Sequence, residues 1–250
     1  MNPSVTNEKT RVIRLAVSGC QGRMGQRIAH FAFSDKDFKV TALLEHAQHP
    51  KANETVQGLK VSTSTDALKG CTVLIEFTTP EATLIHMDAC VKHGVRMVIG
   101  TTGLTPEQTE RIKKASAQIP IVFSSNMSVG VNILFKLAKE LARTAPKNYQ
   151  VNMTEAHHIH KKDAPSGTAK TLAQVIENNS AHKVKNIESI REGEIIGDHK
   201  VVFESAEDVI IIEHHAKTRD IFAKGALVAA KFLAEKNKGL YSMQDVLGLE

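Results

Sequence analysis

The chain has 250 residues, and 42% of them are hydrophobic, which is enough for one large α/β domain or for two smaller domains. Its net charge of +5 is spread along the chain among acidic residues, and it has no Trp and only 2 Tyr, which argues against nucleic acid as a partner. The polar N-terminus and the lack of a long apolar run argue against a secretory signal and a membrane partner, so we expect a cytoplasmic protein.

Apolar runs alternate with helical patterns through the first half of the chain, as in a parallel sheet covered by helices. The first predicted strand, 12–18, leads into a glycine-rich turn and then into a helix. The further predicted strands are 38–45, 72–78, 96–102 and 120–126, and the helices between them begin near Glu81 and Pro106. This order predicts an α/β, Rossmann-type, doubly wound parallel sheet.

After residue 127 the pattern changes, because 129–145 reads as one long amphipathic helix and strands then follow one another more directly. The predicted strands are 149–157, 185–192, 199–205 and 209–216, with a helix near Thr168, and they indicate a second α+β domain built on an open mixed sheet. A last helix, 220–236, is expected to pack back on the first domain. We therefore expect a dinucleotide-binding domain of 1–127 plus 219–250 and a substrate-binding domain of 128–218.

The turn after the first strand carries Gly19, Gly22 and Gly25, a GxxGxxG pattern where the commonest dinucleotide fingerprint is GxGxxG. A strand precedes it, a helix follows it, and Glu45 ends the second strand about 20 residues beyond the last glycine. Glycines let backbone N–H groups approach a pyrophosphate, and the acid can accept hydrogen bonds from a ribose. The pattern predicts a dinucleotide cofactor; the alternative is a glycine-rich turn beside a surface glutamate.

The cofactor is expected to be NADH, NADPH or both. Glu45 would repel a 2′-phosphate, whereas Arg23 and a protonated His46 could attract one. Later strand ends lie where ligands settle in such sheets, and they carry Phe77, Thr78, Gly100, Thr101, Thr102 and the stretch 124–127.

The stretch 155–169, EAHHIHKKDAPSGTA, gathers three histidines, two lysines and a predicted helix start. Its histidines can exchange protons near neutral pH, its lysines add positive charge, and Asp163 can orient a neighbouring group. The turn at 165–168 predicts a helix whose free N–H groups and dipole can hold a carboxylate or phosphate. Acid–base groups, positive charge and an anion site therefore fall together.

A metal site is an alternative interpretation, because His214 and His215 could add ligands to the three histidines of the stretch. No HExxH motif is present, and the adjacent lysines would oppose a cation, so no metal is expected. A solvated loop would explain any single histidine but not the whole set. The cysteines have no CxxC spacing and are expected to be buried, unpaired thiols: Cys20, Cys71 and Cys90.

A catalytic interpretation divides the work between the two parts of the stretch. Ser166, Gly167 and Thr168 would hold a substrate carboxylate while a histidine and a lysine act on the ring or carbonyl being reduced. Hydride addition creates negative charge, so a proton donor must stand nearby. If the strand continued unbroken, His157 and Lys161 would project on the same side, because their spacing is even.

The chain resembles the dihydrodipicolinate reductase family of bacterial lysine biosynthesis over nearly its whole length. The stretch 155–169 fits the family signature E-[AL]-H-H-x-x-K-x-D-A-P-S-G-T-A at every fixed position, and SGCQGRMG, IGTTG and SVGVN support the match. The resemblance implies NAD(P)H-dependent reduction of 4-hydroxy-tetrahydrodipicolinate, a cyclic dicarboxylate, to tetrahydrodipicolinate in the diaminopimelate and lysine pathway. It also implies a homotetramer formed through the domain of residues 128–218.

The family's residue roles carry over by position in the motifs. The resemblance implies His157 and Lys161 as the catalytic residues, with His157 in proton transfer and Lys161 as the proton donor. It implies that His158, Gly167 and Thr168 bind the substrate, and we expect Ser166, in the same turn, to bind it as well. Together with the strand ends, the expected cofactor-binding residues are Gly19, Cys20, Gln21, Gly22, Arg23, Met24, Glu45, His46, Phe77, Thr78, Gly100, Thr101, Thr102, Ser124, Ser125, Asn126 and Met127.

Three features depart from the family's pattern. His46 stands where some relatives place an arginine for the NADPH phosphate, Met127 stands where an aromatic residue can occur, and the stretch 176–187 looks shorter than in longer relatives. Two rival functions remain: a non-catalytic NAD(P)-binding regulator that senses an acidic metabolite or partner, and an amino-acid dehydrogenase of related build. The helix start beside paired histidines favours a dicarboxylate acceptor over either.

Overall fold

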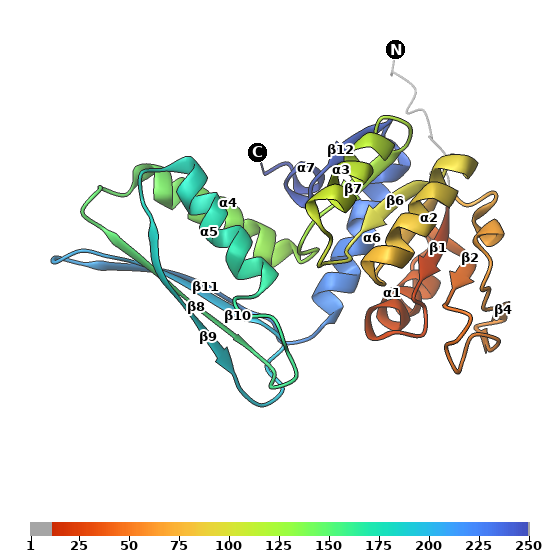
Figure 1. The fold of residues 1–250 in the computed structure, drawn as a ribbon, viewed down its shortest axis with the longest axis horizontal. Helices are drawn as coiled ribbons and strands as arrows, with labels where there is room; N and C mark the ends of the chain where they lie inside the picture. The colour runs from red at the N-terminus through yellow and green to blue at the C-terminus, as the bar shows by residue number, and fades with distance from the viewer. Residues whose placement is uncertain (1–11, 250) are drawn as a thin grey trace, which may run out of the picture.

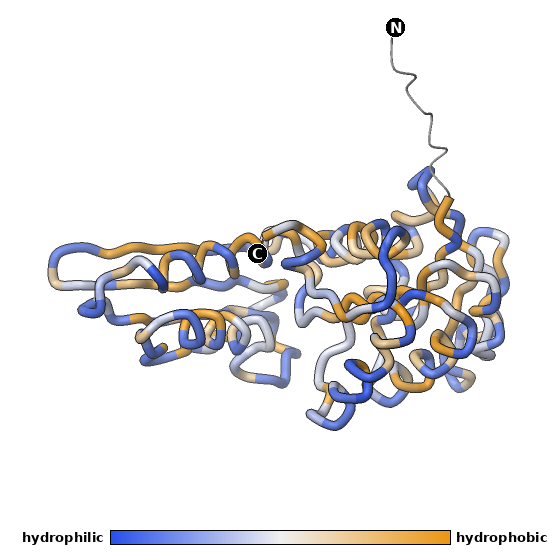
Figure 2. The backbone as a smooth tube through the Cα atoms, turned by 90° about the horizontal axis from the view of Figure 1, so that it is seen from above, coloured by the Kyte–Doolittle hydropathy of each residue, from blue (hydrophilic) through white to orange (hydrophobic). Residues whose placement is uncertain are grey.

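The structure is a computed structural model that describes residues 12–249, so the polar N-terminal segment 1–11 and residue 250 lie outside the described residues. The chain forms a rounded half on a six-stranded sheet and an elongated half on a four-stranded sheet, as Figures 1 and 2 show. Within 12–249, no helix is long and apolar enough to cross a bilayer.

The six-stranded sheet confirms the predicted doubly wound arrangement. Its strands are β1 (Ile13–Ser18), β2 (Phe38–Leu44), β5 (Val73–Glu76), β6 (Arg96–Ile99), β7 (Pro120–Phe123) and β12 (Gly239–Tyr241). They lie in the order β12-β7-β6-β5-β1-β2, and every neighbouring pair is parallel. The chain leaves β1 first to one side and then to the other, so the switch point where such sheets bind ligands lies between β1 and β5.

Helices cover both faces of this sheet, as parallel sheets require. One face packs against α1 (Arg23–Ser34) and α6 (Asp220–Ala234), and the other against α2 (Pro80–His93) and α3 (Pro106–Ala115). Successive residues of β1 alternate between the two cores: Leu15 and Val17 face α1 and α6, whereas Ala16 faces α2 and α3. The expectation that the last long helix packs back on the first half is confirmed.

The four-stranded sheet is mixed and open, as predicted. Its strands are β8 (Gln150–His157), β9 (Val184–Arg191), β10 (Asp198–Glu204) and β11 (Val209–His215), in the order β11-β10-β8-β9. β8 and β9 are parallel and the other pairs antiparallel. The helices α4 (Val129–Thr144) and α5 (Gly167–Asn179) cover one face, where Leu134, Met153 and Phe203 belong to one core (Figure 1).

Three strands of this sheet end earlier than predicted. β5, β6 and β7 end at Glu76, Ile99 and Phe123 rather than at 78, 102 and 126, because the chain turns away from its neighbouring strands at this edge. The residues beyond these ends form loops at the carboxyl edge of the sheet. Short elements were not predicted: β3 (Thr55–Val56), β4 (Leu59–Lys60), the 3₁₀ helix η1 (Thr65–Leu68), β12 and α7 (Met243–Leu247).

Candidate active site

A cleft of about 310 Å³ lies between the two halves, at the carboxyl edge of the six-stranded sheet. Predicted cofactor residues in its lining are Arg23, Met24, Phe77, Gly100, Thr102, Ser124, Ser125, Asn126 and Met127. The central stretch contributes His157, His158, Lys161 and Thr168. The fold therefore brings together two groups of residues that the sequence singled out separately.

The turn between β1 and α1 has the close packing that its glycines predict. A Cβ at Gly25 would lie 2.0 Å from the carbonyl oxygen of Gly19, and a Cβ at Gly100 would lie 2.2 Å from the ring of Phe77. Gly19 has a φ of 59°, in the left-handed region that favours glycine. Gly22 is the N-cap of α1 and has no side chain to accept a hydrogen bond. The N–H groups of the first helical turn are therefore free of a side-chain cap. These features fit a bound pyrophosphate.

Glu45 is held beside this turn. Its Oε2 accepts a hydrogen bond from the backbone N–H of Gln21, and its Oε1 accepts one from the backbone N–H of His46, each at 2.9 Å. Burial, with the nearby charge of Glu45, raises the pKa of the Cys20 thiol to about 11, so this thiol stays protonated. The carboxylate thus lies where a ribose would be expected, and the His46 side chain is exposed beside it.

Thr78 and Thr101 are fixed by a buried carboxylate that the sequence analysis did not single out. Glu76 is 0% exposed, and it accepts hydrogen bonds from Ser18 Oγ at 2.5 Å and from Thr78 Oγ1. Its Oε2 also lies 2.6 Å from Nδ1 of His86, and Thr101 joins the network through the backbone N–H of Thr78 at 3.2 Å. The network ties together the ends of β1, β5 and β6. An acid at the end of an otherwise apolar strand was the signal available in the sequence.

The central stretch begins on the buried face of β8. Val151, Met153, Glu155 and His157 alternate toward the core, so the inward face changes from apolar to ionisable as the strand nears the cleft. The strand ends at His157, and a turn follows in which the N–H of Lys161 donates to the carbonyl of His158 at 3.1 Å. The strand thus ends at His157 as predicted, and the condition of an unbroken strand to Lys161 is not met.

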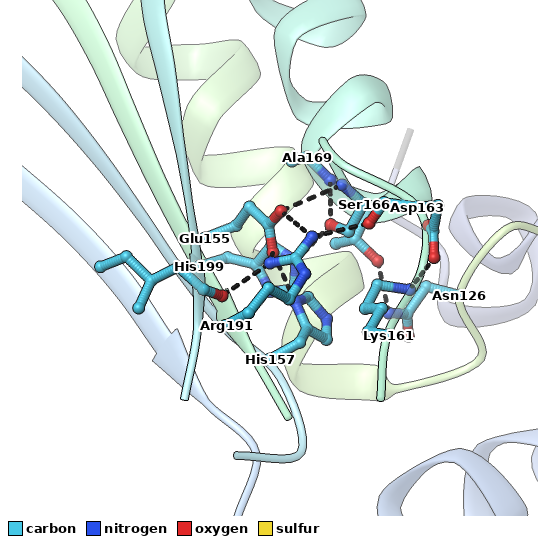
Figure 3. A network of polar contacts seen from close by, with 11 residues as sticks. Asn126, Glu155, His157, Lys161, Asp163, Ser166, Ala169, Arg191 and His199 are labelled. Atoms are coloured by element: carbon cyan, nitrogen blue, oxygen red, sulfur yellow. Dashed lines mark hydrogen bonds and ion pairs between the residues drawn. The ribbon is translucent and has the colours of Figure 1, made fainter. Parts of the chain in front are cut away.

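His157 is paired with Glu155, which Arg191 of β9 binds in turn (Figure 3). Nδ1 of His157 lies 2.5 Å from Glu155 Oε2, and the guanidinium nitrogens of Arg191 donate to both carboxylate oxygens at 3.0 and 2.7 Å. Burial would raise the pKa of Glu155, but hydrogen bonds from Arg191, Ser189 and His157 hold it below its usual value. Burial lowers the pKa of His157, although Glu155 opposes this effect. The resting pair is a carboxylate beside a neutral imidazole.

The other polar residues of the stretch have separate environments. Nζ of Lys161 lies 2.8 Å from Asp163 Oδ1, which confirms the expectation that Asp163 orients a neighbour. Burial, together with Arg219 and Arg23, lowers the pKa of His158, whose Nδ1 has no hydrogen-bond partner among the described residues. His160 points to solvent, and its ring is 70% exposed.

The start of α5 has the geometry predicted for an anion site. Ser166 caps the helix, and its Oγ accepts the N–H of Ala169 at 3.1 Å. Gly167 and Thr168 are the first two helical residues, so their N–H groups have no acceptor within the helix. Asn126 donates to Thr168 Oγ1 at 3.0 Å, which joins the carboxyl edge of the first sheet to this helix start.

Comparisons with known proteins identify the family of the whole chain. Residues 13–127 match the family profile described as "Dihydrodipicolinate reductase, N-terminus", and residues 130–247 match that described as "Dihydrodipicolinate reductase, C-terminus". This chain belongs to the dihydrodipicolinate reductase family. The 4-hydroxy-tetrahydrodipicolinate reductase of Nitrosomonas eutropha is 41% identical over 95% of this chain and 99% of its own. That of Syntrophotalea carbinolica is 40% identical over 96% of this chain and 100% of its own.

A solved member of the dihydrodipicolinate reductase family shares the fold. The dipicolinate-bound dihydrodipicolinate reductase from Paenisporosarcina sp. TG-14 superposes with a TM-score of 0.80 at 25% identity, covering 94% of this chain and 98% of that chain. The similarity spans both halves, so the arrangement of a six-stranded sheet beside a mixed sheet is shared by a member of the family.

In this reductase, the cleft also includes groups that the sequence analysis missed. His199 of β10 is 4% exposed, and its Nε2 lies 3.1 Å from Ser166 Oγ. Arg219 and Gly197 also line the cleft, as does His214, which the sequence analysis had considered only as a metal ligand. The alternation of the predicted strand 199–205 could have indicated that His199 points inward. It lies on the same face of the strand as two apolar residues that are buried. No group of three or more His, Cys, Asp or Glu that could hold a metal occurs within residues 12–249.

Proposed function

We propose that this protein reduces 4-hydroxy-tetrahydrodipicolinate to tetrahydrodipicolinate with NADH or NADPH, in the diaminopimelate and lysine pathway. One observation carries the proposal: the central stretch and the carboxyl edge of a dinucleotide-type sheet line the same cleft. The family and the relatives at about 40% identity support it. Residues 1–127 plus 219–250 would bind the cofactor, and 128–218 the substrate.

The cofactor supplies a hydride from its nicotinamide when it is bound. The residues of the β1–α1 turn would hold its pyrophosphate, and Glu45 would accept hydrogen bonds from its ribose. Arg23 lines the cleft and His46 is exposed beside Glu45, which supports a role for both residues in binding a 2′-phosphate. We therefore expect both NADH and NADPH to serve.

The substrate site is built from the start of α5 and the turn before it. The free N–H groups of Gly167 and Thr168 would bind one carboxylate, where the helix dipole favours negative charge. His158 and Lys161 line the same cleft and would bind the rest of the dicarboxylate. These contacts would hold the ring still while hydride arrives, which is how positioning lowers a barrier.

The reaction consumes one hydride and one proton, and the substrate's hydroxyl leaves as water. Nδ1 of His157 faces a carboxylate, so the neutral ring must keep its proton there and offer Nε2 to the cleft. Such an Nε2 accepts a proton rather than donating one. We therefore assign the donated proton to Lys161, with His157 as the group that exchanges protons with it or with the substrate.

Two further expectations belong to the same proposal. The face of the four-stranded sheet opposite α4 and α5 exposes Val209 and Ile211 by 50% and 48%, which supports tetramer formation through this sheet and can be checked by light scattering. The free, buried thiols of Cys20, Cys71 and Cys90 support a cytoplasmic location, where thiols stay reduced. Recovery of activity in a cytosolic rather than a membrane or secreted fraction checks the second.

Oxidation of NADH and of NADPH, each measured separately and coupled to a fresh supply of the synthase product, tests the proposal. We expect turnover with both cofactors and none with aspartate or another amino acid. Cofactor binding without oxidation would favour the regulator, and turnover of an amino acid would favour the dehydrogenase. Either result would overturn the assignment.

A further inference from the structure

Hydrogen bonds from three neighbouring residues, His157, Arg191 and Ser166, converge on the carboxylate of Glu155 beside one from Ser189 (Figure 3). Its Oε2 faces Nδ1 of His157 at 2.5 Å and accepts from Nη1 of Arg191 at 3.0 Å. Its Oε1 accepts from Nη2 of Arg191 at 2.7 Å and from the backbone N–H of Ser166 at 3.3 Å. A carboxylate offers about four lone-pair sites, so these contacts, together with the hydrogen bond from Ser189, leave none of them free.

We propose that Glu155 is a positioning residue that sets the tautomer of His157 and, at the same time, the position of the α5 N-terminus. The inference rests on the proposed function, which gives His157 to proton transfer and α5 to substrate binding. One buried carboxylate touches both groups directly. The proton-transfer ring and the anion site are therefore held in a fixed relation by hydrogen bonds, and not only by the packing of the sheet.

The tautomer follows from the chemistry of the contact. An ionised carboxylate can only accept hydrogen bonds, so Nδ1 of His157 must carry the proton and Nε2 must face the cleft without one. Gly197 leaves the room for this ring, because a Cβ there would lie 3.1 Å from Nε2. A ring that turned over would lose the carboxylate contact and present Nδ1 to the cleft.

Arg191 keeps Glu155 ionised and extends the network to the loop. It lies opposite His157 in the register of β8 and β9, and its Nη2 also donates to the carbonyl of Asp163 at 2.6 Å. A buried carboxylate without a cation would take up a proton and could then donate to the ring instead. The guanidinium of Arg191 thus ties the loop between β8 and α5 to the carboxylate of Glu155.

The other ionisable groups around His157 do not offer a second anchor. His199 faces Glu155 from β10, but its ring meets that of His157 edge to face at 5.3 Å between centroids. Lys161 is positive and paired with Asp163. Among the described residues, Glu155 is the one carboxylate that hydrogen-bonds the His157 ring.

The imidazole ¹⁵N spectrum of the purified protein tests the tautomer without any substrate. We expect His157 to be protonated at Nδ1 in the wild type, whereas Glu155→Gln should populate the Nε2–H form, because an amide can either accept or donate. The Glu188→Gln variant is the matched control, since Glu188 is an exposed acid on neighbouring β9. An unchanged His157 spectrum in Glu155→Gln would overturn the proposal.

The helix start is tested with dipicolinate as the probe, by calorimetry. Loss of the contact that fixes the Ser166 N–H should weaken dipicolinate binding in Glu155→Gln by at least about fivefold, while Glu188→Gln stays within about twofold. The kcat for the proposed reaction should fall at least about tenfold, with NADH affinity unchanged. If the wild type shows no reductase activity, the proposed function fails, but the spectrum and the dipicolinate titration still decide the inference.

A double variant separates positioning from charge. Glu155→Gln alone leaves Arg191 without its carboxylate, which is costly and could unfold the protein. Glu155→Gln with Arg191→Met removes both charges, so we expect a folded protein that still has the mixed tautomer and the low kcat. Recovery of wild-type kcat and dipicolinate binding in the double variant would show that Glu155 serves only to neutralise Arg191. Glu155→Asp, which keeps the charge, should restore the Nδ1–H form in part.

Discussion

The imidazoles of the cleft are kept neutral chiefly by burial. Burial, with the neighbouring His157, lowers the pKa of His199 to about 3, and burial with His215 lowers the pKa of His214. The rings can therefore exchange hydrogen bonds without adding charge. Positive charge in the cleft comes from Lys161 and from arginines such as Arg219. An anionic substrate would therefore contact a few positively charged side chains and several neutral imidazoles that can donate or accept hydrogen bonds.

Lys161 and its neighbour Lys162 allow a matched test of the proton donor. Lys161 lines the cleft, whereas Lys162 is exposed outside it. We expect Lys161→Met to lower kcat by about 100-fold or more, because a positioned acid contributes on that scale, and to leave the Kd for NADH within about twofold. Steady-state kinetics and a fluorescence titration measure the two. Equal losses in kcat and cofactor affinity, or the same loss in Lys162→Met, would indicate a structural role.

Helix α6 passes very close to the segment that leads from the first sheet to α4. A Cβ at Gly225 would lie 1.8 Å from the carbonyl oxygen of Met127, and both residues are buried. Met127 in turn precedes Ser128, the cap of α4. The glycine in mid-helix is thus a packing requirement at the junction of the two halves.

Replacing Gly225 by Ala should destabilise the protein, although the same change in an open helix would stabilise it by about 1 kcal/mol. The added methyl cannot fit against a backbone oxygen, so we expect a net loss of about 1–3 kcal/mol from overpacking. Urea unfolding measures the difference. Val228→Ala, on the exposed side of the same helix, should change stability by less than about 0.5 kcal/mol. A more stable Gly225→Ala variant would contradict the close approach.

Acid should weaken the whole molecule well before its carboxylates titrate. The pKa values of His157, His158, His199 and His214 are lowered, chiefly by burial, so their neutral forms stabilise the fold above the usual histidine value. That stability is lost as the pH falls through the range between the usual value and the lowered one. For His199, the loss amounts to about 2 kcal/mol between pH 6.5 and pH 5. Asp198 raises the pKa of His215, so the contribution of this histidine to stability increases as the pH falls.

Unfolding free energies at pH 7.5 and pH 5.0 test this expectation. His199→Gln removes the main titrating group, so the variant should lose less stability on acidification than the wild type, even if it is less stable at pH 7.5. His160→Gln, at an exposed ring, is the matched control for the substitution itself. An equal pH dependence in His199→Gln and wild type would show that His199 does not titrate in this way.

Much of this arrangement could be predicted from the chain because it depends on local patterns. The order of strands and helices, the β1–α1 turn and the capped start of α5 each leave a signal within a short window. Arg191 does not, because it reaches Glu155, the neighbour of His157, only through the register of β8 and β9. His199 likewise enters through antiparallel pairing. Pairing between distant strands is set by the fold, so these contacts could not be read from spacing.

The position of β12 bears on how the protein is made. Gly239–Tyr241 pairs with β7, yet it is synthesised after the whole of the four-stranded sheet. During translation, β7 is therefore an open edge of the six-stranded sheet, and α6 is still missing from one face. This lasts until the four-stranded sheet has been synthesised. The six-stranded sheet is therefore completed only after the four-stranded sheet, which carries the other wall of the cleft, has been synthesised.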